Sequence, residues 1–228
     1  MNYRITYLVA LLISSLGTFT ACSQEKTMEP TNTGVFDIIA AKNINKLEQW
    51  ISSQKDLEVR NEKGETPLMA ATYLNELPMV KLLISAGASV NAQDKILNSP
   101  FLYAGASGYL DIVKLCLKAG ADYKIFNRYN GTALIPACEK GHVEVVAELL
   151  KDKAYPINHV NRLGWTALLE AVILSDGNSK QVQIIKMLIE AGCDVNIADK
   201  DGVTALVHAR RQNFKEIITL LENASSKK

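Results

Sequence analysis

The 228-residue sequence has no strong excess of either charge, because 25 Lys and Arg residues are balanced by 24 Asp and Glu residues. This balance gives the chain no general attraction to nucleic acid. Aromatic residues make up only 7% of the chain, and 13 Gly with 6 Pro are too few for a collagen-like array. A lectin-like sandwich is disfavoured for the same reasons. Hydrophobic residues reach 48% against 21% charged, which is typical of a globular protein and argues against a disordered one.

The N-terminal apolar stretch is too short for a membrane-spanning helix, which needs about 20 apolar residues. This stretch, residues 5–16, has twelve residues. It follows the basic Arg4 and precedes small and polar residues. The layout predicts a secretory signal peptide over residues 1–21.

Cys22 stands where this segment ends. The sequence Phe19-Thr20-Ala21-Cys22 resembles the lipobox of bacterial lipoproteins, although Phe19 occupies the place where Leu is usual. The resemblance implies that Cys22 is the first mature residue and carries a lipid that anchors the protein to the membrane. An ordinary cleaved signal and an uncleaved anchor are the alternatives. Polar residues 22–32 are predicted to form a tether between the membrane and the domain that follows.

The same resemblance places the domain in the cell envelope, exported and facing the periplasm. In Gram-negative lipoproteins, Asp directly after the lipidated cysteine often retains the protein in the inner membrane. Ser23 stands there in this chain. The outer membrane is therefore favoured if the source is Gram-negative.

The residues that carry enzyme chemistry are scarce and scattered. No nucleophile motif, phosphate-binding loop or metalloprotease motif is present. The three histidines have no ligand spacing among themselves or with cysteine: His142, His159 and His208. We therefore predict no catalytic residues, no metal, no cofactor and no small-molecule substrate, and a protein that is not an enzyme.

Three cysteines remain after Cys22, and an odd number cannot form a complete disulfide framework within one mature chain. We expect Cys116, Cys138 and Cys193 to be buried thiols that pack as small apolar residues. A Cys116–Cys138 disulfide in an oxidising compartment is the alternative.

What the sequence does contain is an internal repeat. A Thr or Ser followed by a small or Pro residue and an apolar residue recurs at spacings of 33, 33, 34 and 38 residues, starting from Thr66. Counting back 33 residues gives a sixth marker. The markers of the six units are Thr33, Thr66, Ser99, Thr132, Thr166 and Thr204.

Other positions keep the same register and predict two helices per unit. Five residues after each of the last five markers stands a small residue: Ala71, Ala104, Ala137, Ala171 and Ala209. Each marker suits a helix N-cap, and a glycine suits the left-handed position that closes the second helix in three units: Gly87, Gly120 and Gly192. Five inserted residues near 175–179 are expected to lengthen the loop between the two helices of unit five.

This pattern resembles the ankyrin repeat, in which a β-turn is followed by two antiparallel helices. The resemblance covers residues 33–224 and leaves a polar tail at 225–228. It implies an all-α solenoid of six stacked units joined by hairpin-like loops, in which each unit contacts only its neighbours. The family's Thr-Pro-Leu-His motif has lost its His in every unit.

The resemblance also implies a binding face, because hairpin tips and the exposed side of the first helices line a concave groove in ankyrin arrays. Ile173 and Leu174 lie on this face beside the insertion, and folding down against neighbours is an equal alternative for them. Transferring the register gives the remaining candidate partner-binding residues: Tyr73, Leu74, Ile96, Arg128, Tyr129, Arg162, Leu163, Trp165 and Arg211. Tyr, Trp and Arg dominate interface hot spots, which makes protein the expected ligand.

The resulting expectation is a non-catalytic protein–protein interaction module of the bacterial cell envelope that binds an exported protein through its concave face. An inhibitor or immunity-type protein and an accessory protein are two versions of this function. The alternative is an envelope structural or assembly factor with several weak contacts.

Overall fold

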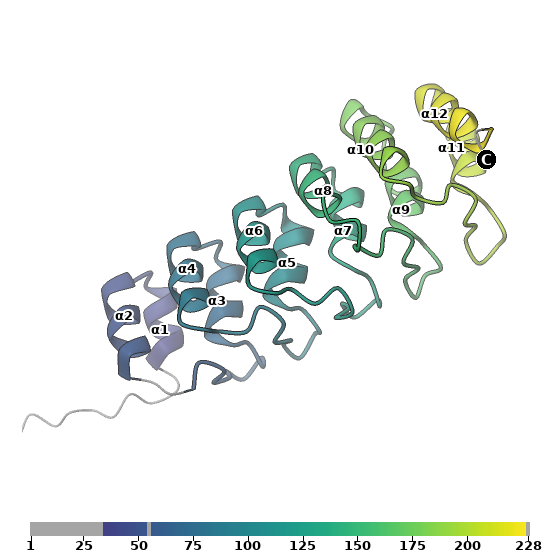
Figure 1. Cartoon of the computed structure of the whole chain (residues 1–228). Coiled ribbons are helices and arrows are strands. Elements are labelled where there is room, and N and C mark those ends of the chain that lie inside the picture. Colours follow the sequence, from purple (N-terminus) through teal and green to yellow (C-terminus); the bar gives the residue numbers. More distant parts are fainter. Residues whose placement is uncertain (1–33, 54–55, 227–228) are drawn as a thin grey trace, which may run out of the picture.

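The computed structural model describes residues 34–53 and 56–226, which form twelve helices in six antiparallel pairs (Figure 1). The signal peptide, Cys22 and the tether therefore lie outside the described residues. The first helices of the units are α1 (Gly34–Ala40), α3 (Pro67–Tyr73), α5 (Pro100–Ser107), α7 (Leu134–Glu139), α9 (Ala167–Ile173) and α11 (Ala205–Arg211). The second helices are α2 (Ile44–Ser53), α4 (Leu77–Ser85), α6 (Leu110–Lys118), α8 (Val143–Leu149), α10 (Ser179–Glu190) and α12 (Lys215–Ser225).

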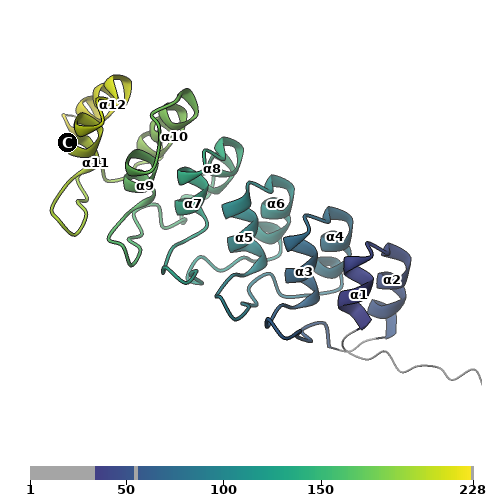
Figure 2. The same ribbon diagram turned by 180° about the vertical axis from the view of Figure 1, so that it is seen from behind.

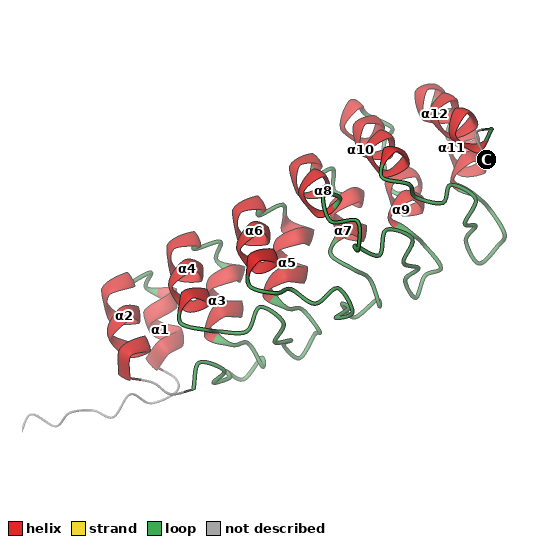
Figure 3. Ribbon diagram, in the orientation of Figure 1, coloured by secondary structure: helices red, strands yellow, loops and turns green. Residues whose placement is uncertain are grey.

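The pairs stack side by side into an elongated array, with the first helices in one layer and the second helices in the other (Figures 1 and 2). Each helix contacts its partner within the unit and the equivalent helix of the next unit. The loops between units project along one side of the array, and the described residues contain no strand (Figure 3). An isolated antiparallel bridge, Ala198 with Thr204, is the one β-type pairing among them.

The repeated alanines lie inside the first-helix layer. Each of the five is fully buried, which confirms the register that the spacing predicts. Apolar side chains of the second helices complete the core at two further repeating positions. Ile218 of the last unit is half-buried, whereas the equivalent Val80, Val113 and Val146 are fully buried. Among the described residues no helix follows α12 to cover Ile218, which explains the difference.

The marker residues cap the first helices in three units, as the sequence predicts. The Thr66 hydroxyl accepts a hydrogen bond from the Met69 amide at 3.2 Å. Ser99 and Thr166 do the same for the amides of Leu102 and Leu169. These bonds satisfy backbone donors that the first helical turn leaves without partners.

The cap prediction is wrong for Thr132, and for Thr204 only the position is confirmed. In unit four the Leu134 amide donates to the hydroxyl of the buried Tyr155 at 3.1 Å, so an aromatic side chain from a later loop replaces the Thr132 cap. Thr204 occupies the N-cap position of α11 but makes no side-chain cap bond. Thr33, the first marker, lies outside the described residues.

The inserted residues of unit five do more than lengthen a loop. The connection between α9 and α10 spans residues 174–178, and α10 has twelve residues where α4 and α6 have nine. The insertion is therefore divided between the loop and an extended helix. Asn178 begins that helix by accepting hydrogen bonds from the amides of Lys180 and Gln181.

The hairpin loops share a set of side-chain hydrogen bonds that was not predicted from the sequence. An Asn or Asp five residues before each of the last five markers accepts hydrogen bonds at Oδ1 from the backbone amides two and four residues later. The five residues are Asn61, Asp94, Asn127, Asn161 and Asp199. Their recurrence at the repeat spacing was a visible signal. These bonds hold each tip in a defined shape.

Cys116, Cys138 and Cys193 are buried, as the packing interpretation predicts, and Cys116 and Cys138 are free thiols that do not form a disulfide. Burial raises the pKa of the Cys116 thiol to about 12 and that of the Cys138 thiol well above its usual range. Both groups are therefore neutral thiols. Over the described part of the chain, no helix combines the length and apolar character needed to cross a membrane.

Candidate functional site

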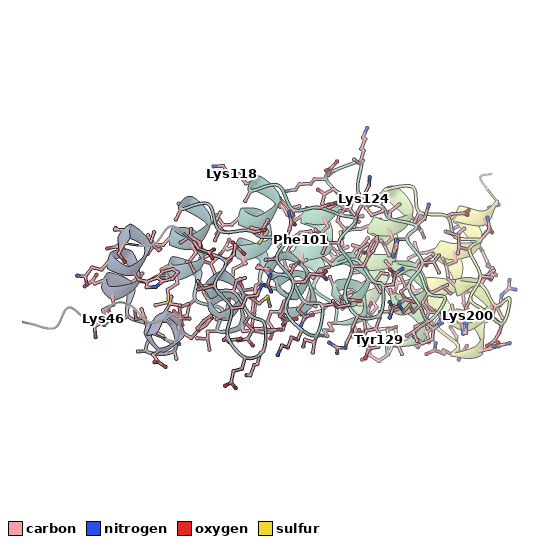
Figure 4. The ribbon with its side chains drawn as sticks, turned by 90° about the horizontal axis from the view of Figure 1, so that it is seen from below. Lys46, Phe101, Lys118, Lys124, Tyr129 and Lys200 are labelled. Atoms are coloured by element: carbon pink, nitrogen blue, oxygen red, sulfur yellow. The ribbon has the colours of Figure 1, made fainter. Side chains whose placement is uncertain are left out.

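The hairpin tips lie along one long edge of the array. Viewed from the loop side, Tyr129 and Lys200 lie along this edge, while Lys118 and Lys124 lie along the opposite edge (Figure 4). Phe101 lies between the two edges and is buried. The tips and the first helices therefore share a surface that the second helices do not reach.

This surface carries a row of exposed large apolar side chains. The five members are Leu74 at 44% exposure, Ile96 at 52%, Tyr129 at 49%, Leu163 at 46% and Leu174 at 49%. They come from four consecutive units and from both tips and first helices. Their exposure agrees with the predicted register. Of the two residues beside the insertion, Leu174 is exposed and Ile173 packs against the core.

Two of the predicted binding residues are turned toward the protein instead. The Tyr73 hydroxyl donates to Asp94 Oδ2 at 2.5 Å and accepts from Asn98 Nδ2 at 2.9 Å. The Trp165 side chain is half-buried and packs against the core. Both side chains are therefore less exposed than the register predicts, and Tyr73 joins α3 to the next tip.

The predicted arginines are exposed, and two of them order adjacent tips. The Arg128 guanidinium carbon lies 4.9 Å from the centroid of the Tyr129 ring. Arg162 donates from its backbone amide to the Tyr129 carbonyl at 2.8 Å and from Nη1 to the Arg128 carbonyl at 3.1 Å. The tips of units four and five are thereby joined. Arg211 ends α11 farther along the array.

The N-terminal part of the groove contains an apolar hollow of about 540 Å³. It lies between α1, α3 and the tips of the next two units. Leu74 and Ile96 border it together with Phe36, Ala40 and Ala70. Lys63 and Glu65 supply charge at its tip side.

A second hollow, of about 410 Å³, lies between units three, four and five. Tyr129, Leu163 and Leu174 form its apolar border. Unlike the first hollow, it also contains two carboxylates from successive first helices, Glu139 of α7 and Glu170 of α9. We call this hollow the Glu170 pocket.

Glu170 is buried, with only 6% of its surface exposed. Its Oε1 accepts a hydrogen bond from Asn161 Nδ2 at 2.8 Å. Burial, reinforced by the nearby negative charge of Glu139, raises the pKa of the Glu170 carboxyl to about 7, although the Asn161 bond acts in the opposite direction. The group is therefore divided between its charged and neutral forms near neutral pH.

Glu170 is not among the residues predicted from the sequence to bind a partner. Four residues after the marker, the equivalent positions of units two to four carry Ala70, Tyr103 and Pro136. The available signal was a charged residue at a position where neighbouring units have apolar or aromatic residues. A glutamate in a short helix is more commonly exposed to solvent, so this signal became informative only once the structure showed that Glu170 is buried.

A metal site in the groove would require several ligands that converge on one point. Among residues 34–53 and 56–226, no group of three or more His, Cys, Asp and Glu could hold a metal ion.

The model of the family described as "Ankyrin repeats (3 copies)" matches residues 38–127 and 104–199. The chain belongs to the ankyrin repeat family. The putative ankyrin repeat protein YahD of Escherichia coli (strain K12) is 37% identical over 178 residues, which cover 78% of this chain and 89% of YahD. Ankyrin repeats are generally protein–protein interaction modules and typically non-catalytic.

Solved ankyrin structures agree with this assignment. An ankyrin repeat domain from Acinetobacter baumannii AYE superposes with a TM-score of 0.83 at 48% identity, covering 86% of this chain and 99% of that domain. A second ankyrin repeat protein, EF0377, superposes with a TM-score of 0.82 at 36% identity, covering 84% of this chain and 98% of its own. The array of six helix pairs is thus an ankyrin solenoid.

Proposed function

We propose that this protein is a non-catalytic binding module that holds a protein partner along its concave face. The observation that carries the proposal is the row of five half-exposed apolar side chains on that face: Leu74, Ile96, Tyr129, Leu163 and Leu174. Single exposed apolar residues are ordinary, whereas an aligned row bordering two hollows is typical of an interaction surface.

The local structure around this row suits binding because it is already ordered. The Asx bonds shape each tip, and the backbone bond from Arg162 to Tyr129 joins two tips across adjacent units. A preorganised surface loses less conformational entropy when a partner binds. The aromatic Tyr129, with Arg128 against its ring, supplies residue types that are enriched in hot spots.

The location of this activity is a second part of the proposal. The signal-like segment 1–21 and the lipobox-like sequence ending at Cys22 support a lipid-anchored protein of the cell envelope. The partner would then be an exported protein, and the outer membrane is the site in a Gram-negative source. Anchoring raises the local concentration of an inhibitor, an immunity-type protein or an accessory factor next to its partner.

The binding activity is tested by affinity capture from the envelope fraction of the parent cell with three forms of the mature domain. These are the wild type, Tyr129→Ala/Leu163→Ala in the groove, and Lys118→Ala/Lys124→Ala on the opposite edge. We expect a stoichiometric partner that the wild type and the opposite-edge variant retain and the groove variant loses. Melting curves confirm that all three forms are folded.

Two outcomes would contradict this assignment. Equal capture by all three forms would place the interaction outside the groove. Weak capture of many proteins, unaffected by the groove variant, would favour the alternative of an envelope structural or assembly factor.

Lipidation has a separate test. Radiolabelled palmitate supplied to cells that express the full chain should be incorporated into the wild type and absent from Cys22→Ser. Incorporation that is unchanged in Cys22→Ser would refute the proposed anchor without affecting the binding activity of the groove.

A further inference from the structure

The Glu170 carboxylate has an oxygen and a negative charge that its structural role does not require. Its bond to Asn161 uses one acceptor oxygen, Oε1, and this bond fixes the Asn161 amide so that Oδ1 can accept from the amides of Leu163 and Trp165. A neutral glutamine would supply the same acceptor. The negative charge and the second oxygen are therefore not needed to shape the hairpin.

The second oxygen and the charge of Glu170 have no partner within the protein. In the described part of the chain, Glu170 Oε2 makes no hydrogen bond, and neither Glu170 nor Glu139 forms an ion pair. Burying an unpaired carboxylate is costly, because the protein replaces the water that would solvate it. An unpaired buried charge beside a hollow is instead well placed for a ligand of opposite charge.

Two cationic residues line the pocket, but the contacts that hold them are with groups other than Glu170. The Lys140 Nζ donates to the Ala106 carbonyl at 3.0 Å. Arg128 also lines the pocket, and its guanidinium lies over the Tyr129 ring. The other ionisable neighbours are Glu139 on α7 and the buried thiol of Cys138, which do not supply positive charge.

We propose that the Glu170 pocket receives an arginine side chain of the protein partner. The inference rests on the proposed function and names the chemistry that this part of the groove recognises. Arginine is favoured over lysine because its planar guanidinium can donate in parallel to two acceptors, here the carboxylates of Glu170 and Glu139. The aliphatic part of the arginine would lie against Leu163, Leu174 and Tyr129, which border the pocket.

Charge complementarity also predicts how binding depends on pH. Because the pKa of Glu170 is about 7, the carboxylate is mostly neutral at pH 5.5 and mostly charged at pH 8. A guanidinium binds the charged form, so affinity should be about tenfold lower, or more, at pH 5.5 than at pH 8. Arginine itself remains protonated throughout this range.

The test uses small probes, which separates this inference from the identity of the partner. N-acetyl-argininamide is titrated at pH 8 into the isotope-labelled mature domain and followed by NMR. N-acetyl-lysinamide and the neutral N-acetyl-citrullinamide are the comparison probes. Expected are shifts confined to the backbone around residues 129–131, 139–140 and 163–174, with at least about tenfold weaker binding of the citrulline probe.

Two variants complete the design. Glu170→Gln preserves the acceptor for Asn161 and should weaken the arginine probe by about tenfold or more while leaving the domain folded. Glu144→Gln removes an exposed carboxylate from the second-helix layer and should leave the affinity unchanged. The Glu170 carboxyl carbon should also titrate at lower pH when the arginine probe is bound.

Three results would overturn the inference. They are equal binding of the citrulline probe, equal or tighter binding of the lysine probe, and an unchanged affinity in Glu170→Gln. If the groove variant still lost its captured partner in those cases, the protein-binding function would stand and only the arginine assignment would fail. If instead the probe bound as expected but no partner depended on the groove, the wider function would fail.

Discussion

Units five and six join the base of the hairpin to the first helix through a side-chain pair of the same spacing, but the carboxylate and the donor change places. In unit five, Asn161 donates to the buried Glu170 nine residues later. In unit six, Asp199 occupies the place of Asn161, and its Oδ2 lies 2.7 Å from Nε2 of His208, again nine residues later. In both units the first residue also accepts two backbone amides of the tip.

The difference lies in whether the carboxylate has a partner that can carry positive charge. The hydrogen bond from His208, together with the tip amides, lowers the pKa of Asp199. Glu170 has only an amide donor and a second carboxylate nearby, so its pKa is raised. One architecture therefore accommodates a compensated and an uncompensated charge, and the uncompensated one lies in a pocket of the concave face.

The largest expected effect comes from removing the amide of unit five. Asn161→Ala eliminates the single donor to Glu170 and the acceptor of two tip amides. The free energy of unfolding at pH 8 should fall by about 3 kcal/mol, since a buried carboxylate is left without any donor. Asp199→Ala should cost less, because it leaves no buried carboxylate without a donor. Urea denaturation of both variants measures the difference, and equal losses would contradict it.

The next effect is the pH dependence that Glu170 adds to stability. The folded state holds this proton more tightly than the unfolded state, where the pKa is near 4.5. The free energy of unfolding therefore falls as pH rises from about 4.5 to about 7. Glu170→Gln should exceed the wild type by about 2 kcal/mol at pH 8 and match it at pH 4. A constant difference between the two proteins across this range would exclude a raised pKa.

Converting unit five to the chemistry of unit six sharpens the comparison. The double variant Asn161→Asp/Glu170→His places a carboxylate and an imidazole where an amide and a carboxylate stood. We expect stability at pH 8 to rise by about 1 kcal/mol, since the buried negative charge gains a compensating partner. The arginine probe should no longer bind. Continued probe binding would show that Glu170 is not the recognition element.

The smallest effect is expected for His208→Leu, which removes the side-chain donor to Asp199. The pKa of Asp199 should rise toward its ordinary value, as followed by NMR of its carboxyl carbon. A lowered carboxyl pKa stabilises the folded state above the ordinary pKa and loses this effect as pH falls through the lowered value. The melting temperature at pH 7 should therefore decrease slightly. An unchanged Asp199 pKa would remove the basis of the comparison.

The array and its register could be predicted from the sequence because they depend on features that recur. Ala137 is buried where the spacing places it, and Gly87 adopts a positive φ of 99° where a helix must close. The cap of α7 could not be predicted, because the donor is satisfied by Tyr155 from a non-repeating loop. The same reason applies to Tyr73, whose hydroxyl bonds to residues of the next unit.

Some features of the candidate site could likewise be predicted from the sequence, and others could not. Exposure of Tyr129 and Leu163 follows from their place at the tips, so transferring the family register was sufficient. Burial of Glu170 follows from what adjacent helices and tips place around it. A single helix of seven residues contains no sign of that enclosure.

Residue order alone therefore decides the periodic part of this protein: six units, two helices in each, the inward alanines and the side on which the tips lie. These features arise from local preferences and from one packing contact that is repeated. Tertiary structure decides which polar groups are compensated, because the electrostatic environment of a side chain depends on neighbours that are distant in sequence. It was the stacking of units three to five that turned Glu170 from an ordinary helical glutamate into a buried charge without a partner.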